Sequence, residues 1–273
     1  MLSNRKLRIG KISFANVWPI FYILEKDADC SPYEFVEGVP SALNRMLRAG
    51  EIDISPSSSI EYLRNPERYD IIENHSISAD GPVGSIFLFS REPIEALDGQ
   101  TILTSSQSET SVALVEIICR KFYGLSCSFV SSEEPIGKAL QSHAAYMLIG
   151  DDAISQSRQW PALHIYDLGD LWKRHTGLPF TYALWLVRKE CPQQTPAALS
   201  SFIHDLDRAK QTALANLRSI AAVSPFRSML SEDDLVAYWK GISYDFTPAH
   251  RKGLDLFRQY AEELGLLPAA FFS

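Results

Sequence analysis

Segments with the apolar pattern of strands alternate with segments patterned like helices, and this order restricts the fold more than any other feature of the sequence. The first predicted strands and helices lie, in chain order, at residues 7–14, 18–25, 33–37, 41–49 and 52–55, and Gly50 ends the second helix. Such a βαβαβ order produces parallel strands joined by right-handed crossovers. The first part of the chain is therefore expected to form a parallel sheet covered by helices.

A second cycle follows, and the chain then becomes helical. Strands are predicted at residues 84–91, 101–104, 126–130, 144–149 and 181–188, with helices at 111–123 and 136–141. Helix-start patterns open the tail at Thr195, Ser231 and Thr247. This order predicts a two-lobed α/β protein with a ligand cleft between the lobes and a helical C-terminal segment. We expect residues 1–90 and 187–273 in lobe 1 and residues 91–186 in lobe 2.

Charge and cysteine content exclude several classes of function. A net charge of −7 over 273 residues leaves no basic stripe for a nucleic-acid partner. The four cysteines form no CxxC pair and no zinc pattern, so we expect reduced thiols and no metal. No long apolar run follows the basic residues Arg5, Lys6 and Arg8. Neither a signal peptide nor a membrane anchor is expected, and a cytoplasmic location is predicted.

Several loops that follow predicted strands are rich in polar groups. Ligands of open α/β sheets collect at the carboxyl ends of strands and at the starts of the next helices. The loops in question are residues 13–19, 55–59, 80–85, 104–111 and 150–152. They offer hydroxyls, backbone N–H groups and one amide, which suit a carboxylate ligand. The alternative is that the serines and threonines only cap helices. A cap needs only one side chain, so capping alone does not account for all the hydroxyls of residues 105–111.

Individual polar residues allow two interpretations each. Asn16 faces either the start of a helix or the cleft. Asp151 and Asp152 fit a helix cap with a solvated neighbour better than a general base. His75 and His143 have no partner close in sequence and are expected to be packing or surface residues.

Motifs of several enzyme classes are missing from the sequence. No GxGxxG follows the first strand, and GxxxxGK[ST], GxSxG and HExxH do not occur. Nucleotide-dependent chemistry and zinc hydrolysis are therefore not expected. Binding remains, or an elimination or isomerisation that needs little beyond positioning and dipoles.

The loops resemble those of a known family. The matching segments begin with Arg8-Ile9-Gly10 and Ser13-Phe14-Ala15-Asn16-Val17-Trp18-Pro19, and continue at residues 39–44, 52–62, 76–85, 148–151 and 167–180. Together they resemble the chorismate dehydratase family, which acts in the futalosine route to menaquinone. The likeness spans residues 7–190, and the helical tail is less distinctive.

This resemblance implies a type II periplasmic-binding-protein-like fold used by a cytoplasmic enzyme. It implies that water is removed from chorismate to give 3-[(1-carboxyvinyl)oxy]benzoate, without metal or organic cofactor. Loss of the ring C3 proton and the C4 hydroxyl aromatises the ring, so the driving force lies in the substrate. The enolpyruvyl carboxylate of the substrate is expected to take the proton.

The resemblance also suggests site residues. Asn16 and Ser85 are implied as catalytic. The implied substrate-binding residues are Ser57, Ser58, Ser105, Ser106, Thr110, Ser111, Gly150 and Asp151. The first motif departs from the family's usual Ser-Tyr-Leu-Asn, because Phe14 stands where a tyrosine hydroxyl is expected.

Three rival functions remain at this point. A non-catalytic small-anion-binding protein shares the fold but normally carries export features. The related 1,4-dihydroxy-6-naphthoate synthase should have a histidine in the candidate loops, and none is present. A regulatory effector-binding domain lacks the expected DNA-reading helix. The expected partner is a small dicarboxylate rather than nucleic acid or membrane, with the oligomeric state open.

Overall fold

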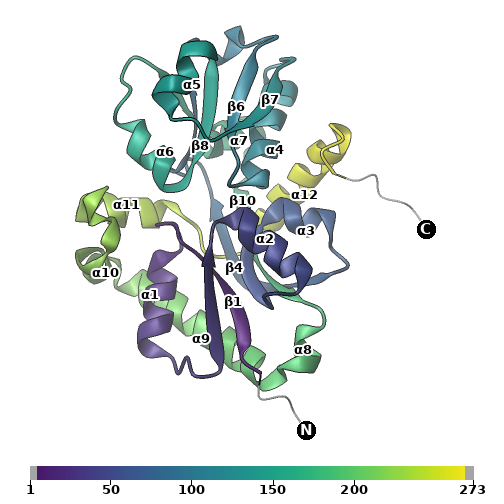
Figure 1. Cartoon of the computed structure of the whole chain (residues 1–273), viewed down its shortest axis with the longest axis vertical. Helices are drawn as coiled ribbons and strands as arrows, with labels where there is room; N and C mark the ends of the chain where they lie inside the picture. Colours follow the sequence, from purple (N-terminus) through teal and green to yellow (C-terminus); the bar gives the residue numbers. More distant parts are fainter. Residues whose placement is uncertain (1–4, 268–273) are drawn as a thin grey trace. The chain divides into compact units, whose positions relative to one another are not determined.

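Two five-stranded sheets, each covered by helices, make up the computed structural model, which describes residues 5–267 (Figure 1). The chain divides into two compact units. Unit 1 runs to Ile77 and includes Ala183–Asp245. Unit 2 holds Ser78–Tyr182 and residues 246–267. The predicted α/β class with a helical C-terminal segment is confirmed.

The sheet of unit 1 has the strand order β2-β1-β3-β10-β4. Its strands are β1 (Leu7–Ile12), β2 (Tyr33–Gly38), β3 (Ile54–Ser58), β4 (Tyr69–Ala79) and β10 (Phe180–Arg188). Ile9 of β1 pairs in parallel with Phe35 of β2 and with Ile54 of β3, as the predicted βαβαβ order requires. Strand β10 then pairs with β3 in antiparallel register.

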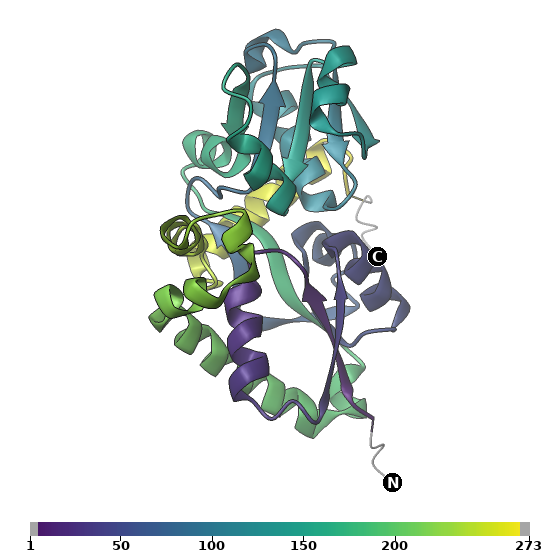
Figure 2. The same cartoon turned by 60° about the vertical axis from the view of Figure 1, so that its left-hand side comes forward.

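Seven α-helices belong to the part of unit 1 that the structure describes. They are α1 (Trp18–Asp27), α2 (Pro40–Ala49), α3 (Ser59–Arg64), α8 (Cys191–Gln194), α9 (Pro196–Ala215), α10 (Leu217–Val223) and α11 (Glu232–Gly241). Helix α1 packs along α9, as the view in Figure 2 shows. Their rings meet over the sheet, where Trp185 of β10 lies 5.6 Å from Phe21 and 5.8 Å from Phe202 between ring centroids. Burial of such rings is the main favourable contribution to folding.

The sheet of unit 2 has the order β7-β6-β8-β5-β9. Its strands are β5 (Ile86–Ser90), β6 (Thr101–Ser105), β7 (Ser128–Ser132), β8 (Ala145–Ile149) and β9 (His164–Asp167). The helices are α4 (Glu109–Ile117), which continues into a π-helical turn at Ile118–Phe122, then α5 (Ile136–Ser142), α6 (Gly150–Ser157), α7 (Leu168–Thr176) and α12 (Pro248–Glu263). Strand β6 runs parallel to β7 and β8, whereas β5 runs antiparallel to β8.

An aromatic cluster fastens α12 to unit 2. The ring of Phe257 lies 5.0 Å from Phe180 and 6.4 Å from Trp172, all three fully buried. Gly253 of α12 faces the carbonyl of Pro179 so closely that a Cβ there would lie 2.1 Å from its oxygen. The close approach of these backbones therefore requires glycine.

The unit boundaries differ from the division expected for the lobes. Residues 78–90 and 246–267 lie in unit 2, although they were expected in lobe 1. Strand β5 hydrogen-bonds to β8 and β9, and α12 joins the aromatic cluster. Residues 183–186 go with unit 1 because β10 pairs with β3.

Several element predictions need correction. Strand β3 continues through Pro56 to Ser58, so Ser57 and Ser58 are strand residues rather than loop residues. Pro56 is tolerated in this strand although it cannot donate to the ladder. The helix predicted to start at Thr195 ends at Ala215, and Asn216 separates it from α10.

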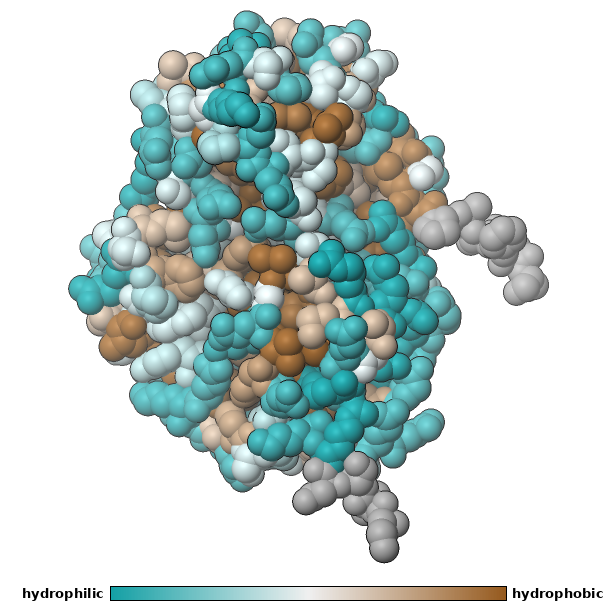
Figure 3. All heavy atoms as spheres, viewed as in Figure 1, coloured by the Kyte–Doolittle hydropathy of each residue, from teal (hydrophilic) through white to brown (hydrophobic). Residues whose placement is uncertain are grey.

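The surface is mostly hydrophilic on the face drawn in Figure 3, with hydrophobic residues in smaller areas. Large apolar side chains that stand out into solvent, among residues 5–267, are Val130, Leu214 and Val223. No helix in that same range is both long enough and apolar enough to cross a membrane.

A buried histidine gives unit 1 a pH-dependent stability. His75 is 1% exposed, and its Nε2 lies 2.8 Å from Oδ1 of Asp207. Burial, and then the positive charge of Lys210, lower the pKa of His75 below its usual 6.5, against the opposing effect of Asp207. Protons therefore bind the unfolded chain more readily than the folded one, and stability falls as the pH falls from 6.5 through the lower folded pKa.

We expect the midpoint of thermal unfolding to decrease between about pH 7.5 and about pH 5.5. The variant His75→Gln should show a flatter dependence, because glutamine can still donate to Asp207 but does not titrate. The exposed His204 supplies the matched control, His204→Gln. Equal slopes for wild type and His75→Gln would show that His75 is not responsible.

Candidate functional site

The loop after β1 presents Asn16 from a fixed backbone. The carbonyl of Ala15 accepts a hydrogen bond from Nε1 of Trp239 at 2.8 Å, and the carbonyl of Asn16 accepts one from the hydroxyl of Tyr244 at 2.6 Å. Burial raises the pKa of Tyr244 well above 10.0, so this hydroxyl keeps its proton. The side-chain Oδ1 of Asn16 is buried and has no hydrogen-bond partner among residues 5–267. A buried acceptor without a partner is costly, which makes Oδ1 of Asn16 a candidate for contact with a ligand.

Two serines at the end of β3 lie at the same edge of the sheet. Strands β1 and β3 are parallel, with Ile9 opposite Ile54, so both carboxyl ends reach that edge. Ser57 is fully buried, and its hydroxyl has no partner among the described residues. Successive strand residues point to opposite faces, so Ser58 points away from Ser57.

Asn44 of α2 holds Ser58, and Asn44 was not among the predicted site residues. Its Nδ2 donates to Oγ of Ser58 at 2.6 Å, and its Oδ1 accepts from the Ser58 backbone N–H at 3.3 Å. Because the amide donates to the hydroxyl oxygen, the hydroxyl proton of Ser58 remains available for an anion. Asn44 itself is 1% exposed.

A buried carboxylate supports the same corner of unit 1. Glu61 of α3 is fully buried and receives Nε and Nη2 of Arg48 at 3.1 and 2.5 Å. The hydroxyl of Tyr69 and Nδ2 of Asn65 also donate to it, at 2.8 and 3.1 Å. Such a charge is tolerated in a core only when it is paired and hydrogen-bonded in this way.

In unit 2, three strands bring their polar ends to one edge. The parallel strands β6 and β8 end at Ser105 and before Gly150, and the antiparallel strand β5 begins after Ser85 at the same edge. Ser85 is buried, and its carbonyl accepts the N–H of Gly150 at 2.7 Å. Gly150 adopts a φ of +62° and starts α6, with Asp151 in its first turn. This edge of the sheet therefore holds Ser85, Ser105 and the start of α6.

Some of the hydroxyls at the start of α4 accept backbone N–H groups and therefore act as caps. Its N-cap is Ser108, which accepts the N–H of Ser111 at 3.3 Å, and the two hydroxyls lie 3.1 Å apart. The hydroxyl of Ser105 accepts the N–H of Gln107 at 3.3 Å. Thr110 is fully buried in the first turn. Capping therefore accounts for part of this loop, and Ser108 is a cap that the sequence did not single out.

The predicted site residues fall into two groups. Asn16, Ser57 and Ser58 belong to unit 1, and Ser85, Ser105, Ser106, Thr110, Ser111, Gly150 and Asp151 belong to unit 2. Ser106 differs from the rest of its group because it is exposed and donates to Glu133 at 3.1 Å. Within residues 5–267, no group of three or more His, Cys, Asp or Glu side chains has the arrangement of a metal site.

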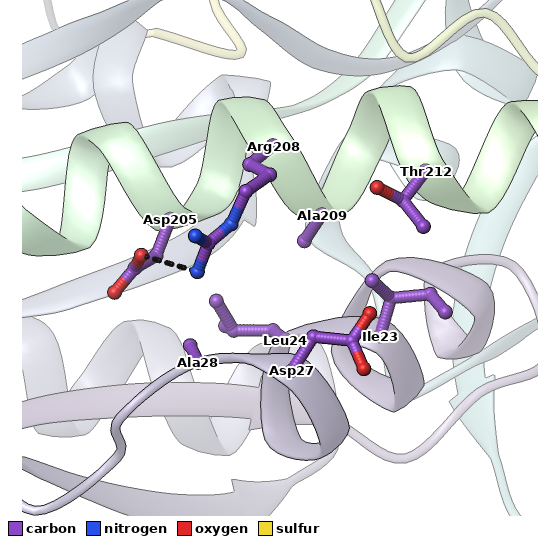
Figure 4. A pocket seen from close by; sticks show the side chains of 8 residues that line it. All are labelled: Ile23, Leu24, Asp27, Ala28, Asp205, Arg208, Ala209 and Thr212. Carbon is purple, nitrogen blue, oxygen red and sulfur yellow. Dashed lines mark hydrogen bonds and ion pairs between the residues drawn. The ribbon is translucent and has the colours of Figure 1, made fainter.

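Two surface hollows of unit 1 are lined by other residues. One of about 260 Å³ runs between α1 and α9, where Figure 4 shows Arg208 paired with Asp205 at 3.0 Å. The other, of about 490 Å³, lies at the start of α9 beside Arg5 and Lys6. None of the predicted site residues lines either hollow.

Known proteins with similar sequences or structures indicate the family and the fold of this chain. A family model described as "Menaquinone biosynthesis" matches residues 7–263. A curated protein of Thermus thermophilus named chorismate dehydratase is 28% identical over 279 residues, with 97% of each chain covered. A solved structure from Archaeoglobus fulgidus matches with a TM-score of 0.78 at 19% identity, covering 98% of this chain and 100% of that one. The periplasmic aliphatic sulphonate binding protein of Escherichia coli matches with a TM-score of 0.68 at 13% identity, covering 97% and 89%. The structural neighbours confirm the periplasmic-binding-protein-like fold.

Proposed function

The chain belongs to the menaquinone biosynthesis family, and from this premise we propose that it is an enzyme that removes water from chorismate. The observation that carries the proposal is its alignment, over 97% of both chains, with the chorismate dehydratase of Thermus thermophilus. The product is 3-[(1-carboxyvinyl)oxy]benzoate, and the reaction class is a carbon–oxygen lyase. As a biosynthetic enzyme, the protein would work in the cytoplasm.

The geometry of the candidate site suits this reaction. Elimination of the C4 hydroxyl and the C3 proton makes the ring aromatic, so the protein has to position the substrate more than activate it. Two carboxylates need donors, and the starts of α4 and α6 with their neighbouring serines supply N–H and hydroxyl groups. The proton acceptor in this proposal is the enolpyruvyl carboxylate of the substrate.

Roles for individual residues follow from their surroundings. Asn16 and Ser85 are proposed to act on the reacting part of the substrate, since Oδ1 of Asn16 is buried without a partner and the backbone of Ser85 is fixed by Gly150. The hydroxyl of Ser58, held by Asn44, is proposed to donate to a carboxylate. The other proposed substrate-binding residues are Ser57, Ser105, Ser106, Thr110, Ser111, Gly150 and Asp151.

The alternative is a small-anion-binding protein without catalysis. It is favoured by one observation, the fold shared with the sulphonate binding protein. Mixing the purified protein with chorismate separates the two, because only the enzyme forms an aromatic product that absorption or proton NMR detects. Saturable binding of unchanged chorismate would support the anion-binding function instead.

We expect metal removal to leave the activity unchanged. The residues proposed to act are an amide, hydroxyls and backbone N–H groups, which are poor ligands for zinc. Turnover should therefore be the same, within error, before and after dialysis against a chelator. Loss of activity that zinc or another divalent metal restores would refute a cofactor-free mechanism.

A further inference from the structure

We propose that Asp167, at the start of α7, is a positioning residue that fixes the backbone leading into Ser85. The inference rests on the proposed function, because it gives Ser85 a part in chorismate dehydration. Asp167 lies 82 positions from Ser85 in the sequence, and nothing in the local pattern connects the two.

The carboxylate of Asp167 accepts four backbone N–H groups. Its Oδ1 accepts from Gly169 at 2.9 Å and from Asp170 at 3.1 Å, which are the bonds of an ordinary N-cap. Its Oδ1 also accepts from Val83 at 3.0 Å, and its Oδ2 accepts from Gly84 at 2.7 Å. Burial raises the pKa of Asp167, and the same four donors act to lower it.

Helix capping explains only half of this arrangement. The N-cap serines of α4 and α11, Ser108 and Ser231, each accept one N–H of their own helix. Asp167 accepts two N–H groups of its own helix and two more from the loop that contains Val83 and Gly84. The second pair ties α7 to the residues just before Ser85.

The rest of α7 also shapes this loop. A Cβ at Gly169 would lie 2.4 Å from the carbonyl oxygen of Gly81 and 3.1 Å from the N of Val83, so the loop packs directly on the first turn of the helix. One turn further along, Lys173 forms an ion pair with Asp80. Helix α7 and its N-cap therefore contact the loop from Asp80 to Gly84.

Ser85 is fixed from both sides as a result. Gly84 before it adopts a φ of +71° and is held by Asp167, while the carbonyl of Ser85 is held by the N–H of Gly150. Without the carboxylate, the N–H groups of Val83 and Gly84 lose their partner, and the loop has to shift towards water or another acceptor. A displacement of about 1 Å at a reacting group can cost about 10²-fold in rate.

The variants Asp167→Ala and Asp167→Asn test this role. We expect Asp167→Ala to lower kcat by about 10²-fold with a smaller change in KM, because the displaced group acts on the reaction rather than on binding. Asp167→Asn keeps one carbonyl acceptor and should recover part of the loss. Asp98→Asn is the matched control, since Asp98 accepts a single backbone N–H, from Ser126, at an exposed position.

A double-mutant cycle with Ser85→Ala decides whether Asp167 acts through Ser85. In the Ser85→Ala background, Asp167→Ala should have little further effect on kcat, because the group that it positions is already gone. Hydrogen exchange should meanwhile rise in residues 80–86 of both Asp167 variants and not in Asp98→Asn. Purely additive losses of kcat, or unchanged exchange in residues 80–86, would overturn the inference while leaving the proposed function intact. A wild-type protein that does not convert chorismate would refute the proposed function and this inference with it.

Discussion

Asn16→Ala is expected to lower kcat by at least about 10²–10³-fold, the loss usually seen when one preorganised polar group is removed from a reacting centre. Tyr244 holds the backbone of Asn16 through the Asn16 carbonyl, and Oδ1 of the side chain has no hydrogen-bond partner among residues 5–267. The variant should therefore fold normally. Initial rates of aromatic product formation give the effect on kcat, and the thermal midpoint reports on the fold.

The control for this experiment is Asn216→Ala, because Asn216 is an exposed amide between α9 and α10. It should retain the wild-type rate. Asn16→Asp adds a second comparison, since it keeps the size of the side chain and replaces the amide by a carboxylate that repels an anionic substrate. If Asn16→Ala turns over chorismate at nearly the wild-type rate, Asn16 has no part in the mechanism.

Phe257→Ala is expected to destabilise the protein by about 3–5 kcal/mol, the usual cost of removing a large buried ring. Phe257 is fully buried against Phe180 and Trp172, on the helix that the structure assigns to unit 2. The shift of the urea midpoint measures the loss. Leu214→Ala serves as control, because Leu214 is 42% exposed and should change stability by less than about 0.5 kcal/mol.

The same variant tests where α12 belongs. Hydrogen exchange in Phe257→Ala should increase first in α7 and in β10 near Phe180, which contact the missing ring. An increase confined to β1, β2 and α1 would instead show that α12 stabilises unit 1, as the expected division of lobes had placed it.

The regular parts of the fold could be predicted from sequence because their signals are local. The apolar strands of unit 1 and the Gly50 stop of α2 were recognisable from periodicity and glycine alone. Strand β4 was missed because Asn74 and His75 interrupt its apolar pattern, and Asn74 adopts a φ of +59°. Helix α7 was missed because its short amphipathic pattern follows directly on the strand β9.

Some residues of the candidate site could likewise be predicted from local sequence signals, and others could not. Asn16 and the serines stand in loops whose position after a strand already favours a ligand. Asn44 and Asp167 could not be found like this, because the groups that they hold are 14 and 83–84 positions away. Even the N-cap role of Asp167 was not predicted, and that role accounts for only half of its bonds. The remaining bonds depend on tertiary structure.

The division of both units along the chain has a consequence for how the protein forms during synthesis. All five strands of the second sheet leave the ribosome before residue 168, yet Phe257 follows some 90 residues later. At about 5–20 residues per second, Trp172 and Phe180 wait several seconds for the ring that covers them. Unit 1, which needs the chain only as far as Asp245, can finish first. Unit 1 is thus complete before unit 2, although its strand β10 is translated after all five strands of the second sheet. Until Phe257 is translated, Trp172 and Phe180 of unit 2 are the aromatic residues of the nascent chain that would need protection from aggregation.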